Sequence, residues 1–323
     1  MISNLESLFS DAFKYILNSK NIYIASHVQP DGDNIGSLLA LGMALLKLEK
    51  DVYILKSDII PSDFSFLPNI ELIKDYDGAD DIDLFIAIDS SDEERLGKNR
   101  DLLSKSKLTI NIDHHISNTR FGDINIVDEN ASSTGELIFE FIKFMNISID
   151  EKIATCLYTA ISTDTGSFMY SNTSAKAHEI AAELIRFGAD TENININIYQ
   201  NKSLERIKLF IKTMNNLEFY FDNKVALVSI TQKMLEDCNA SMEDSEGIIS
   251  FVRGISPVEI AVLLKELSDN EIKISMRSKR YVDVSSICYN FGGGGHIRAA
   301  GCTIYDSLEK AKALIINEIK KYI

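Results

Sequence analysis

The chain has 323 residues, 45% of them hydrophobic, and a formal net charge of −15. Its length exceeds what one hydrophobic core usually serves, so we expect about two compact domains. The acidic balance disfavours binding to long nucleic acid, because affinity for a phosphate backbone requires a basic surface. No segment approaches the roughly 20 apolar residues that cross a bilayer. We therefore expect a globular, cytoplasmic protein with no membrane partner, acting on small substrates.

The cysteine pattern indicates a reducing compartment. The chain contains four cysteines, at positions 156, 238, 288 and 302, and none of them forms a CxxC pair. Zinc ribbons require such pairs, and disulfide frameworks are a property of small exported domains. We expect four reduced and mostly buried thiols.

The first half of the chain alternates short apolar runs with helical patterns. The first twenty residues place charged side chains among apolar ones, as an amphipathic helix does and a signal peptide does not. Apolar runs follow at residues 22–25, 52–55, 84–88 and 108–112, and a helical pattern covers residues 35–48. This order is typical of a parallel α/β sheet. Polar residues follow three of the runs, and the carboxyl ends of parallel strands share one edge, so we expect these residues to converge.

The second half predicts more helices, a connector and another domain. Helical patterns cover residues 132–147, 151–162 and 174–187, and Gly188 is placed to cap the last of them. Residues 192–220 look helical and polar. A strand at 224–230, a hairpin at 259–267 and 272–276, a glycine-rich loop and a terminal helix follow. The predicted fold is α/β: a parallel-sheet domain over residues 1–190, a helical connector over 191–215 and a smaller α/β domain over 216–323.

Metal-capable side chains gather where the predicted strands end. His27, Asp31 and Asp33 share one loop between a strand and a helix. The single residue between the two aspartates lets their carboxylates reach different ions. Asp89 ends another strand, and the two oxygens of its carboxylate suit a bridge between cations about 3.5–4 Å apart.

His114, His115 and Asp164 extend this set of ligands. Oxygen and imidazole donors without thiolate favour two Mn²⁺ ions per chain, with Mg²⁺ or Co²⁺ as alternatives. Taken singly, each residue fits a simpler role, since a strand-end aspartate is often a helix cap and a lone histidine is often a surface group. Their joint occurrence at predicted sheet ends indicates a dinuclear site.

A glycine run near the C-terminus predicts a second anion site. Residues without side chains let backbone amides approach a phosphate or a base, and a nearby guanidinium can grip phosphate through two hydrogen bonds. Residues 251–300 hold seven Lys or Arg against five Asp or Glu, a local excess of positive charge. Lys279 and Arg280 are interpreted as a solvated hairpin end. The predicted substrate-binding residues here are Arg277, Gly293, Gly294, Gly295, His296 and Arg298.

Five segments of the chain resemble the motifs of a known family. In chain order, SHVQPDGDNIGS, AIDSSD, NIDHH and STDTGSF are similar to four motifs of DHH phosphoesterases. FGGGGHIRAAG resembles the substrate-binding motif of the DHHA1 domain. The resemblance extends over about residues 5–305. It implies a phosphoesterase that uses two metal ions.

The resemblance also implies a role for each candidate residue. The implied ligands are His27, Asp31 and Asp89 for one ion, and Asp33, Asp89, His114 and Asp164 for the other. His115 is implied to lie beside the substrate phosphate, and with Asp89 and His114 it forms the predicted catalytic set. Met169 departs from the larger polar or basic residue that we expect at its position, which bears on substrate length and not on catalysis.

Within the family, the chain looks like bacterial enzymes that degrade very short RNA and dephosphorylate 3′-phosphoadenosine 5′-phosphate (PAP). We therefore expect short single-stranded RNA or DNA oligonucleotides and small nucleotides as substrates, and no long nucleic acid. The sequence leaves a homodimer open. An alternative of the same class is a linear or cyclic dinucleotide phosphodiesterase, whereas a pyrophosphatase is disfavoured because the glycine loop suits a nucleotide. An alternative of a different class is a nucleotide- or RNA-binding protein without turnover. Loss of a motif ligand would mark such a protein, and none of the motif ligands is missing from this sequence.

Overall fold

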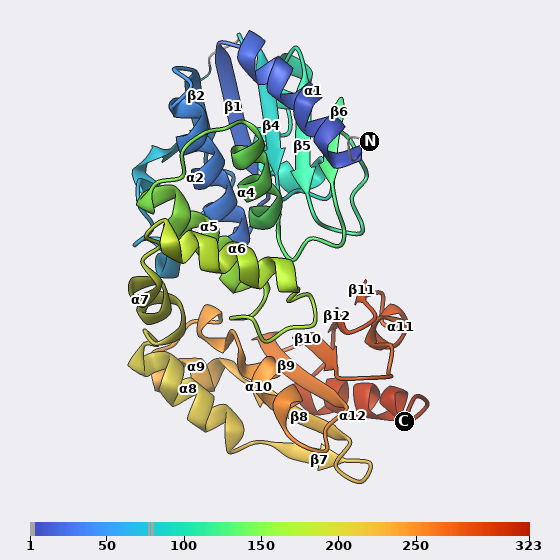
Figure 1. The fold of residues 1–323 in the computed structure, drawn as a ribbon. Helices are drawn as coiled ribbons and strands as arrows, with labels where there is room; N and C mark the ends of the chain where they lie inside the picture. The colour runs from blue at the N-terminus through green and yellow to red at the C-terminus, as the bar shows by residue number, and fades with distance from the viewer. Residues whose placement is uncertain (1–3, 77, 79–80) are drawn as a thin grey trace. The chain divides into compact units, whose positions relative to one another are not determined.

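The computed structural model of the chain describes residues 4–76, 78 and 81–323 (Figure 1). The fold divides into two units, Met1–Asn201 and Lys202–Ile323. Both are α/β, which confirms the predicted fold class. Among the described residues, none of the helices combines the length and the apolar character that a bilayer crossing needs.

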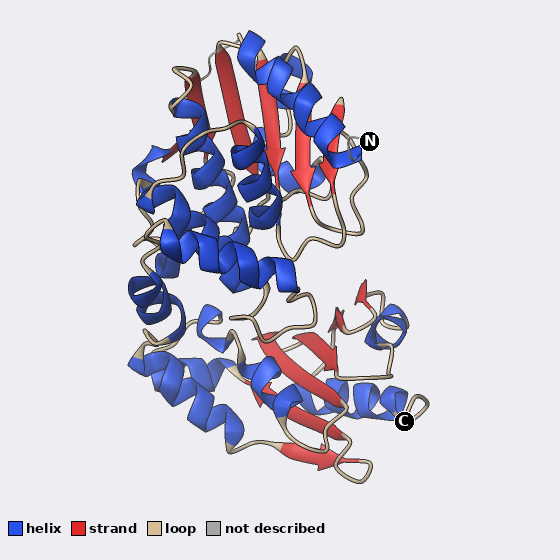
Figure 2. Ribbon diagram, viewed as in Figure 1, coloured by secondary structure: helices blue, strands red, loops and turns tan. Residues whose placement is uncertain are grey.

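The first unit is built on a six-stranded parallel sheet (Figure 2). Its strands are β1 (Asn21–Ser26), β2 (Asp51–Leu55), β3 (Ile73–Lys74), β4 (Leu84–Ile88), β5 (Thr109–Asp113) and β6 (Ile124–Val127). The four predicted strands are confirmed as β1, β2, β4 and β5, while β3 and β6 were not predicted. In the order β3-β2-β1-β4-β5-β6, strands β2 and β3 are added on one side of β1, and strands β4 to β6 are added on its other side. A crevice opens at such a switch point, outside the carboxyl ends of the strands.

Helices cover this sheet in layers. The helices are α1 (Asn4–Asn18), α2 (Gly32–Leu46), α3 (Leu102–Lys105), α4 (Thr134–Phe144), α5 (Glu151–Asp164) and α6 (Ala175–Arg186), with short turns η1 (Ser62–Phe64), η2 (Ile70–Leu72) and η3 (Glu94–Asn99). Helices α1, α2 and α4 contact the strands, and α5 packs on α2 and α4. The predicted helix over 151–162 continues to Asp164, which therefore lies in its last turn and not beyond it. Gly188 has φ +96°, as expected of a left-handed cap.

The predicted helical stretch over 192–220 is interrupted. It contains α7 (Thr191–Ile194), the π-helical turn η4 (Asn195–Tyr199) and α8 (Leu204–Met214). Ser203 is the N-cap of α8, and its side chain accepts a hydrogen bond from the amide of Arg206. Residues 218–220 are not helical but form strand β7, which pairs with the next strand.

The second unit contains a mixed six-stranded sheet in the order β11-β12-β10-β9-β8-β7. Its strands are β7 (Glu218–Tyr220), β8 (Val225–Ile230), β9 (Ile260–Ser268), β10 (Glu271–Ser278), β11 (Gly294–His296) and β12 (Ala299–Ile304), and its helices are α9 (Gln232–Cys238), α10 (Ile248–Gly254), α11 (Val284–Tyr289) and α12 (Leu308–Ile319), with the turn η5 (Glu243–Ser245). The predicted strand at 224–230 and the predicted hairpin are confirmed. The prediction of a loop is wrong for residues 294–296, which form an edge strand.

Side chains alternate between two cores in this sheet. Ala261 and Leu263 of β9 face a core that includes residues of α8, α9 and α10. Val262 and Leu264 face the opposite core, to which α11 and α12 contribute. Register therefore assigns every residue of the sheet to one of two faces.

Candidate active site

The carboxyl edge of the first sheet brings together side chains from β1, β4 and β5 and from helices α2 and α5. His27, Asp31 and Asp89 offer ligand atoms that all lie within 4.8 Å of one another. Asp33, His114 and Asp164 form a second group by the same measure. Each group has the composition of a site for a divalent cation.

Asp89 stands between the two groups. Its Oδ2 lies 3.2 Å from Nε2 of His27, and its Oδ1 lies 3.9 Å from Nε2 of His114. The side chain is only 2% exposed, and the residue has φ +54°, which a non-glycine residue rarely adopts. The backbone at the end of β4 is thus held in an unusual conformation that directs one carboxylate oxygen at each group.

Two histidines have a backbone carbonyl beside Nδ1 and turn Nε2 toward the carboxylates of the ligand groups. Nδ1 of His27 lies 2.7 Å from the carbonyl of Val28, and Nδ1 of His114 lies 3.3 Å from the carbonyl of Ala131. A carbonyl only accepts, so Nδ1 carries the proton in both neutral rings. Such a partner fixes the ring and directs the lone pair of Nε2 at a metal.

His115 has a different environment. Its Nδ1 donates to Oδ1 of Asp113 at 2.7 Å, and Asp113 is buried and also accepts from the side-chain amide of Asn118. The hydrogen bond to Asp113 raises the pKa of His115 to about 9, although burial opposes the shift. This shift favours the protonated form of the ring. The ring borders a hollow of about 280 Å³ that Arg120 also lines. Its Nε2 takes no part in the hydrogen bond to Asp113.

The carboxylates are too close together for all of them to ionise without added positive charge. Burial and the charges of Asp89 and Asp164 raise the pKa of Asp33 well above its usual range. Burial raises the pKa of Asp164 to about 6, although the charge of His114 opposes the shift. Burial would also raise the pKa of Asp89, but the hydrogen bond and charge of His27 hold it below its ordinary value. The donor set therefore fits two divalent cations, which would favour the ionised forms of Asp33 and Asp164.

Helix α4 supplies contacts that the sequence did not predict. The amides of Thr134 and Gly135, at the first turn of α4, donate to the two oxygens of Asp33 at 2.7 and 2.8 Å. The hydroxyl of Thr134 donates to Oδ1 of Asp89 at 2.8 Å. One residue thus orients two carboxylates. The segment Ser132-Ser133-Thr134 marks a helix start in the sequence, but nothing in it shows which carboxylates the helix meets.

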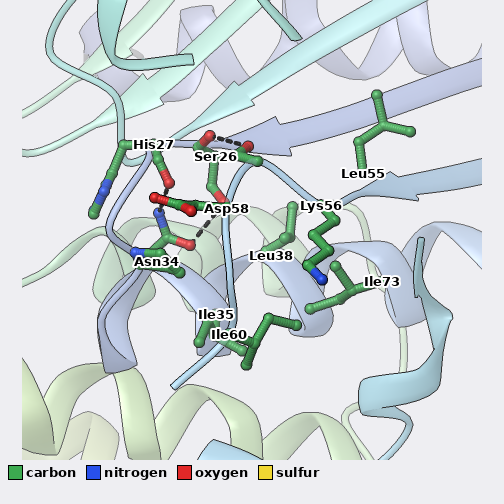
Figure 3. Close-up of a pocket in the computed structure, with 12 residues that line it drawn as sticks. Ser26, His27, Asn34, Ile35, Leu38, Leu55, Lys56, Asp58, Ile60 and Ile73 are labelled. Carbon is green, nitrogen blue, oxygen red and sulfur yellow. Dashed lines mark hydrogen bonds between the residues drawn. The ribbon is translucent and has the colours of Figure 1, made fainter. Parts of the chain in front are cut away.

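Asn34 fixes the loop that carries His27 (Figure 3). Its side chain accepts from the hydroxyl of Ser26 at 2.7 Å and donates to the carbonyl of His27 at 3.2 Å. Its backbone amide donates to Oδ1 of Asp31, which caps α2. Asp31 therefore combines the helix-cap role with a position in the first ligand group.

In the second unit, register places two predicted substrate residues on one face of the sheet. Arg277 of β10 and His296 of β11 both pair with Ala299 of β12, so both side chains point to the face of Leu263. The next row on this face contains only small residues in β10, β12 and β11, namely Ser275, Gly301 and Gly294. This small-residue row lies beside a guanidinium and an imidazole.

The glycines and Arg298 also have structural roles. A Cβ at Gly293 or Gly295 would lie closer to the backbone of β12 than van der Waals contact allows, so both positions are needed for strand packing. A Cβ at Gly294 would meet nothing within 4 Å. The guanidinium of Arg298 donates to the carbonyl of Val282 at 2.7 Å. Of these four residues, Gly294 has the space most suited to a ligand.

Comparison with known proteins identifies the family. The profile of the DHH family, N-terminal domain, matches residues 21–161, and that of the DHHA1 domain matches residues 222–323. The chain belongs to the DHH family. This confirms the resemblance that the five sequence segments indicated.

Relatives match along nearly the whole chain. A Thermus thermophilus protein named bifunctional oligoribonuclease and PAP phosphatase NrnA is 31% identical over 306 residues, which cover 93% of this chain and 89% of the relative. A Bacillus subtilis protein of the same name is 30% identical over 289 residues, covering 88% and 89%. The crystal structure of an exopolyphosphatase-related protein from Bacteroides fragilis superposes with a TM-score of 0.91 at 30% identity, covering 98% and 96%. The chain is thus a DHH phosphoesterase in sequence and fold.

The contacts of Thr134 predict a measurable effect on metal binding. Thr134→Val keeps the shape of the side chain but removes the hydroxyl that orients Asp89, so Mn²⁺ affinity should fall about tenfold to a hundredfold. Thr134→Ser keeps the hydroxyl and should restore affinity to within about threefold of the unaltered protein. Isothermal titration calorimetry with Mn²⁺ checks both values, and thermal melting of the metal-free variants controls for folding. Equal affinities in the Val and Ser variants would show that the hydroxyl has no such role.

Proposed function

We propose that the protein hydrolyses short oligoribonucleotides to mononucleotides and dephosphorylates PAP, using two Mn²⁺ ions with Mg²⁺ or Co²⁺ as alternatives. The observation that carries the proposal is the position of Asp89, with one carboxylate oxygen directed at each of two ligand groups. The names of the Thermus and Bacillus relatives supply the substrate class. The free, buried thiols agree with an enzyme of the cytoplasm.

The chain's own residues divide between holding the ions and handling the substrate. His27, Asp31 and Asp89 hold one ion in this proposal. The residues assigned to the other ion are Asp33, Asp89, His114 and Asp164. When bound, the two cations supply the Lewis acidity that activates a water and neutralises phosphate oxygens.

His115 acts on the phosphate and not on a metal. Its Nδ1 donates to Asp113, and the raised pKa of the ring favours a second proton on Nε2, which could then donate to a phosphate oxygen. A donor placed beside the metal groups stabilises the negative charge that builds on a non-bridging phosphate oxygen during hydrolysis. Asp113 holds the ring in the orientation that this role needs.

The second unit positions the nucleotide. Arg277 and His296 share one sheet face with the open position Gly294, so this face offers a nucleotide two polar side chains beside a position without a side chain. Gly293 and Gly295 let β11 approach β12 closely enough to form that face. Arg298 braces the neighbouring loop through Val282 and also offers positive charge there.

A panel of substrates tests the proposed function directly. With Mn²⁺ present, dinucleotides, pentanucleotides and PAP should be hydrolysed with kcat/KM at least about tenfold above that for a 24-mer, because the acidic surface repels long nucleic acid. Cyclic dinucleotides and pyrophosphate complete the panel. Preferred hydrolysis of a cyclic dinucleotide would favour the phosphodiesterase alternative, and binding without turnover of any compound would favour the non-catalytic one.

Variants of the second unit test the division of labour. Arg277→Ala and His296→Ala should each lower kcat/KM on PAP by roughly tenfold to a hundredfold, since each removes a charge-assisted hydrogen bond to phosphate of about 1.5–3 kcal/mol. Both should retain two bound Mn²⁺ ions and nearly full activity on bis-p-nitrophenyl phosphate, which needs little positioning. Arg280→Ala is the matched control and should leave both activities unchanged. Equal losses on the two substrates, or loss of an ion, would place these residues in the catalytic centre instead.

A further inference from the structure

Two lysines face each other across neighbouring strands of the second sheet. Lys265 of β9 pairs directly with Lys273 of β10. Both residues point to the same face as Arg277, because residues 273, 275 and 277 of one strand alternate with those that face the opposite core. Four residues of strand place the Cα atoms of Lys273 and Arg277 about 13 Å apart. The face that carries the proposed nucleotide site thus has a second basic position.

The charges of this lysine pair are not balanced by a carboxylate in contact. Among the residues that the structure describes, neither lysine takes part in an ion pair. Glu246 is the acidic group that acts on Lys265, through space and not through a hydrogen bond. Burial and the charge of Lys273 lower the pKa of Lys265. Like charges placed directly opposite on two strands are destabilising, so an anion bound between them would relieve the repulsion.

Small side chains separate the lysine pair from Arg277. The row between them consists of Leu263, Ser275, Gly301 and Gly294 in strand order, and only Leu263 is large. Leu263 belongs to the core that includes residues of α10, and α10 also contacts β10, so the part of the row farthest from α10 is Gly301 of β12 and Gly294 of β11, which carry no side chains. Thr303 of β12 pairs with Lys273 and adds a hydroxyl on the same face. A chain of sugars and phosphates could therefore lie along the face from one basic position to the other.

We propose that Lys265, Lys273 and Thr303 form a second phosphate subsite, which binds the backbone of an oligonucleotide whose terminal nucleotide is held at Arg277 and His296. The inference rests on the proposed function and extends it to substrate length. PAP is a single nucleotide, so the subsite contributes to oligonucleotides and not to PAP. The occupant is a phosphodiester of single-stranded RNA or DNA.

The double variant Lys265→Gln/Lys273→Gln tests the subsite. It should lower kcat/KM on a pentanucleotide about tenfold or more and leave kcat/KM on PAP within about twofold of the unaltered protein. The salt dependence of log kcat/KM on the pentanucleotide should become less steep by about 0.7 for each phosphate that the variant no longer neutralises. Lys224→Gln/Lys320→Gln makes the same change in charge at two exposed positions outside the β9–β10 pairing and should change neither substrate's kcat/KM.

Binding without turnover separates this inference from the proposed function. With EDTA present, anisotropy of a fluorescein-labelled pentanucleotide should report an affinity about tenfold weaker for the Lys265→Gln/Lys273→Gln protein than for the control variant, with equal melting temperatures. Equal affinities, or equal reductions of kcat/KM on PAP and pentanucleotide, would overturn the subsite. Failure of the unaltered protein to hydrolyse either compound would overturn the proposed function, while the anisotropy result would still decide the subsite.

Discussion

Mutual repulsion among carboxylates at one sheet edge determines which contacts and ligands this site requires. Asp33, Asp89 and Asp164 all place an oxygen within 3.6–3.9 Å of Nε2 of His114. Burial and crowding of these carboxylates raise the pKa values of Asp33 and Asp164, which marks a shortage of positive charge at this edge. Two divalent cations would bring four positive charges to it. Ions that bind only the folded state also stabilise it, which links the folding of this edge to its chemistry.

The fold reduces the cost of this repulsion with backbone dipoles. Helices α2 and α4 both begin at the cluster: Asp31 caps α2, Asp33 lies in its first turn, and the first amides of α4 donate to Asp33. Helix N-termini carry partial positive charge and stabilise nearby anions. Negative charge is thus held in place before any ion arrives. The parallel sheet makes this possible, because its strands deliver their loops, and the helices that follow, to the same edge.

Sequence predicted what depends on local pattern and missed what depends on tertiary contact. Apolar runs located four strands of the first sheet, but two-residue β3 and four-residue β6 are too short to give such a signal. Motif residues identified the ligand groups, whereas Thr134 acts on Asp89 across 45 positions of sequence. The glycine run suggested a loop, yet residues 294–296 form a strand because β12 offers them backbone partners. The Lys265–Lys273 pair likewise becomes visible only through strand register.

Anomalous diffraction from crystals grown with Mn²⁺ tests whether Asp89 joins two cations at this edge. Two peaks about 3.5–4 Å apart should appear, with a different oxygen of Asp89 within about 2.2 Å of each. One peak should contact His27 and the other His114. A single peak at saturating Mn²⁺, or two peaks of which Asp89 touches only one, would contradict a bridging role for Asp89.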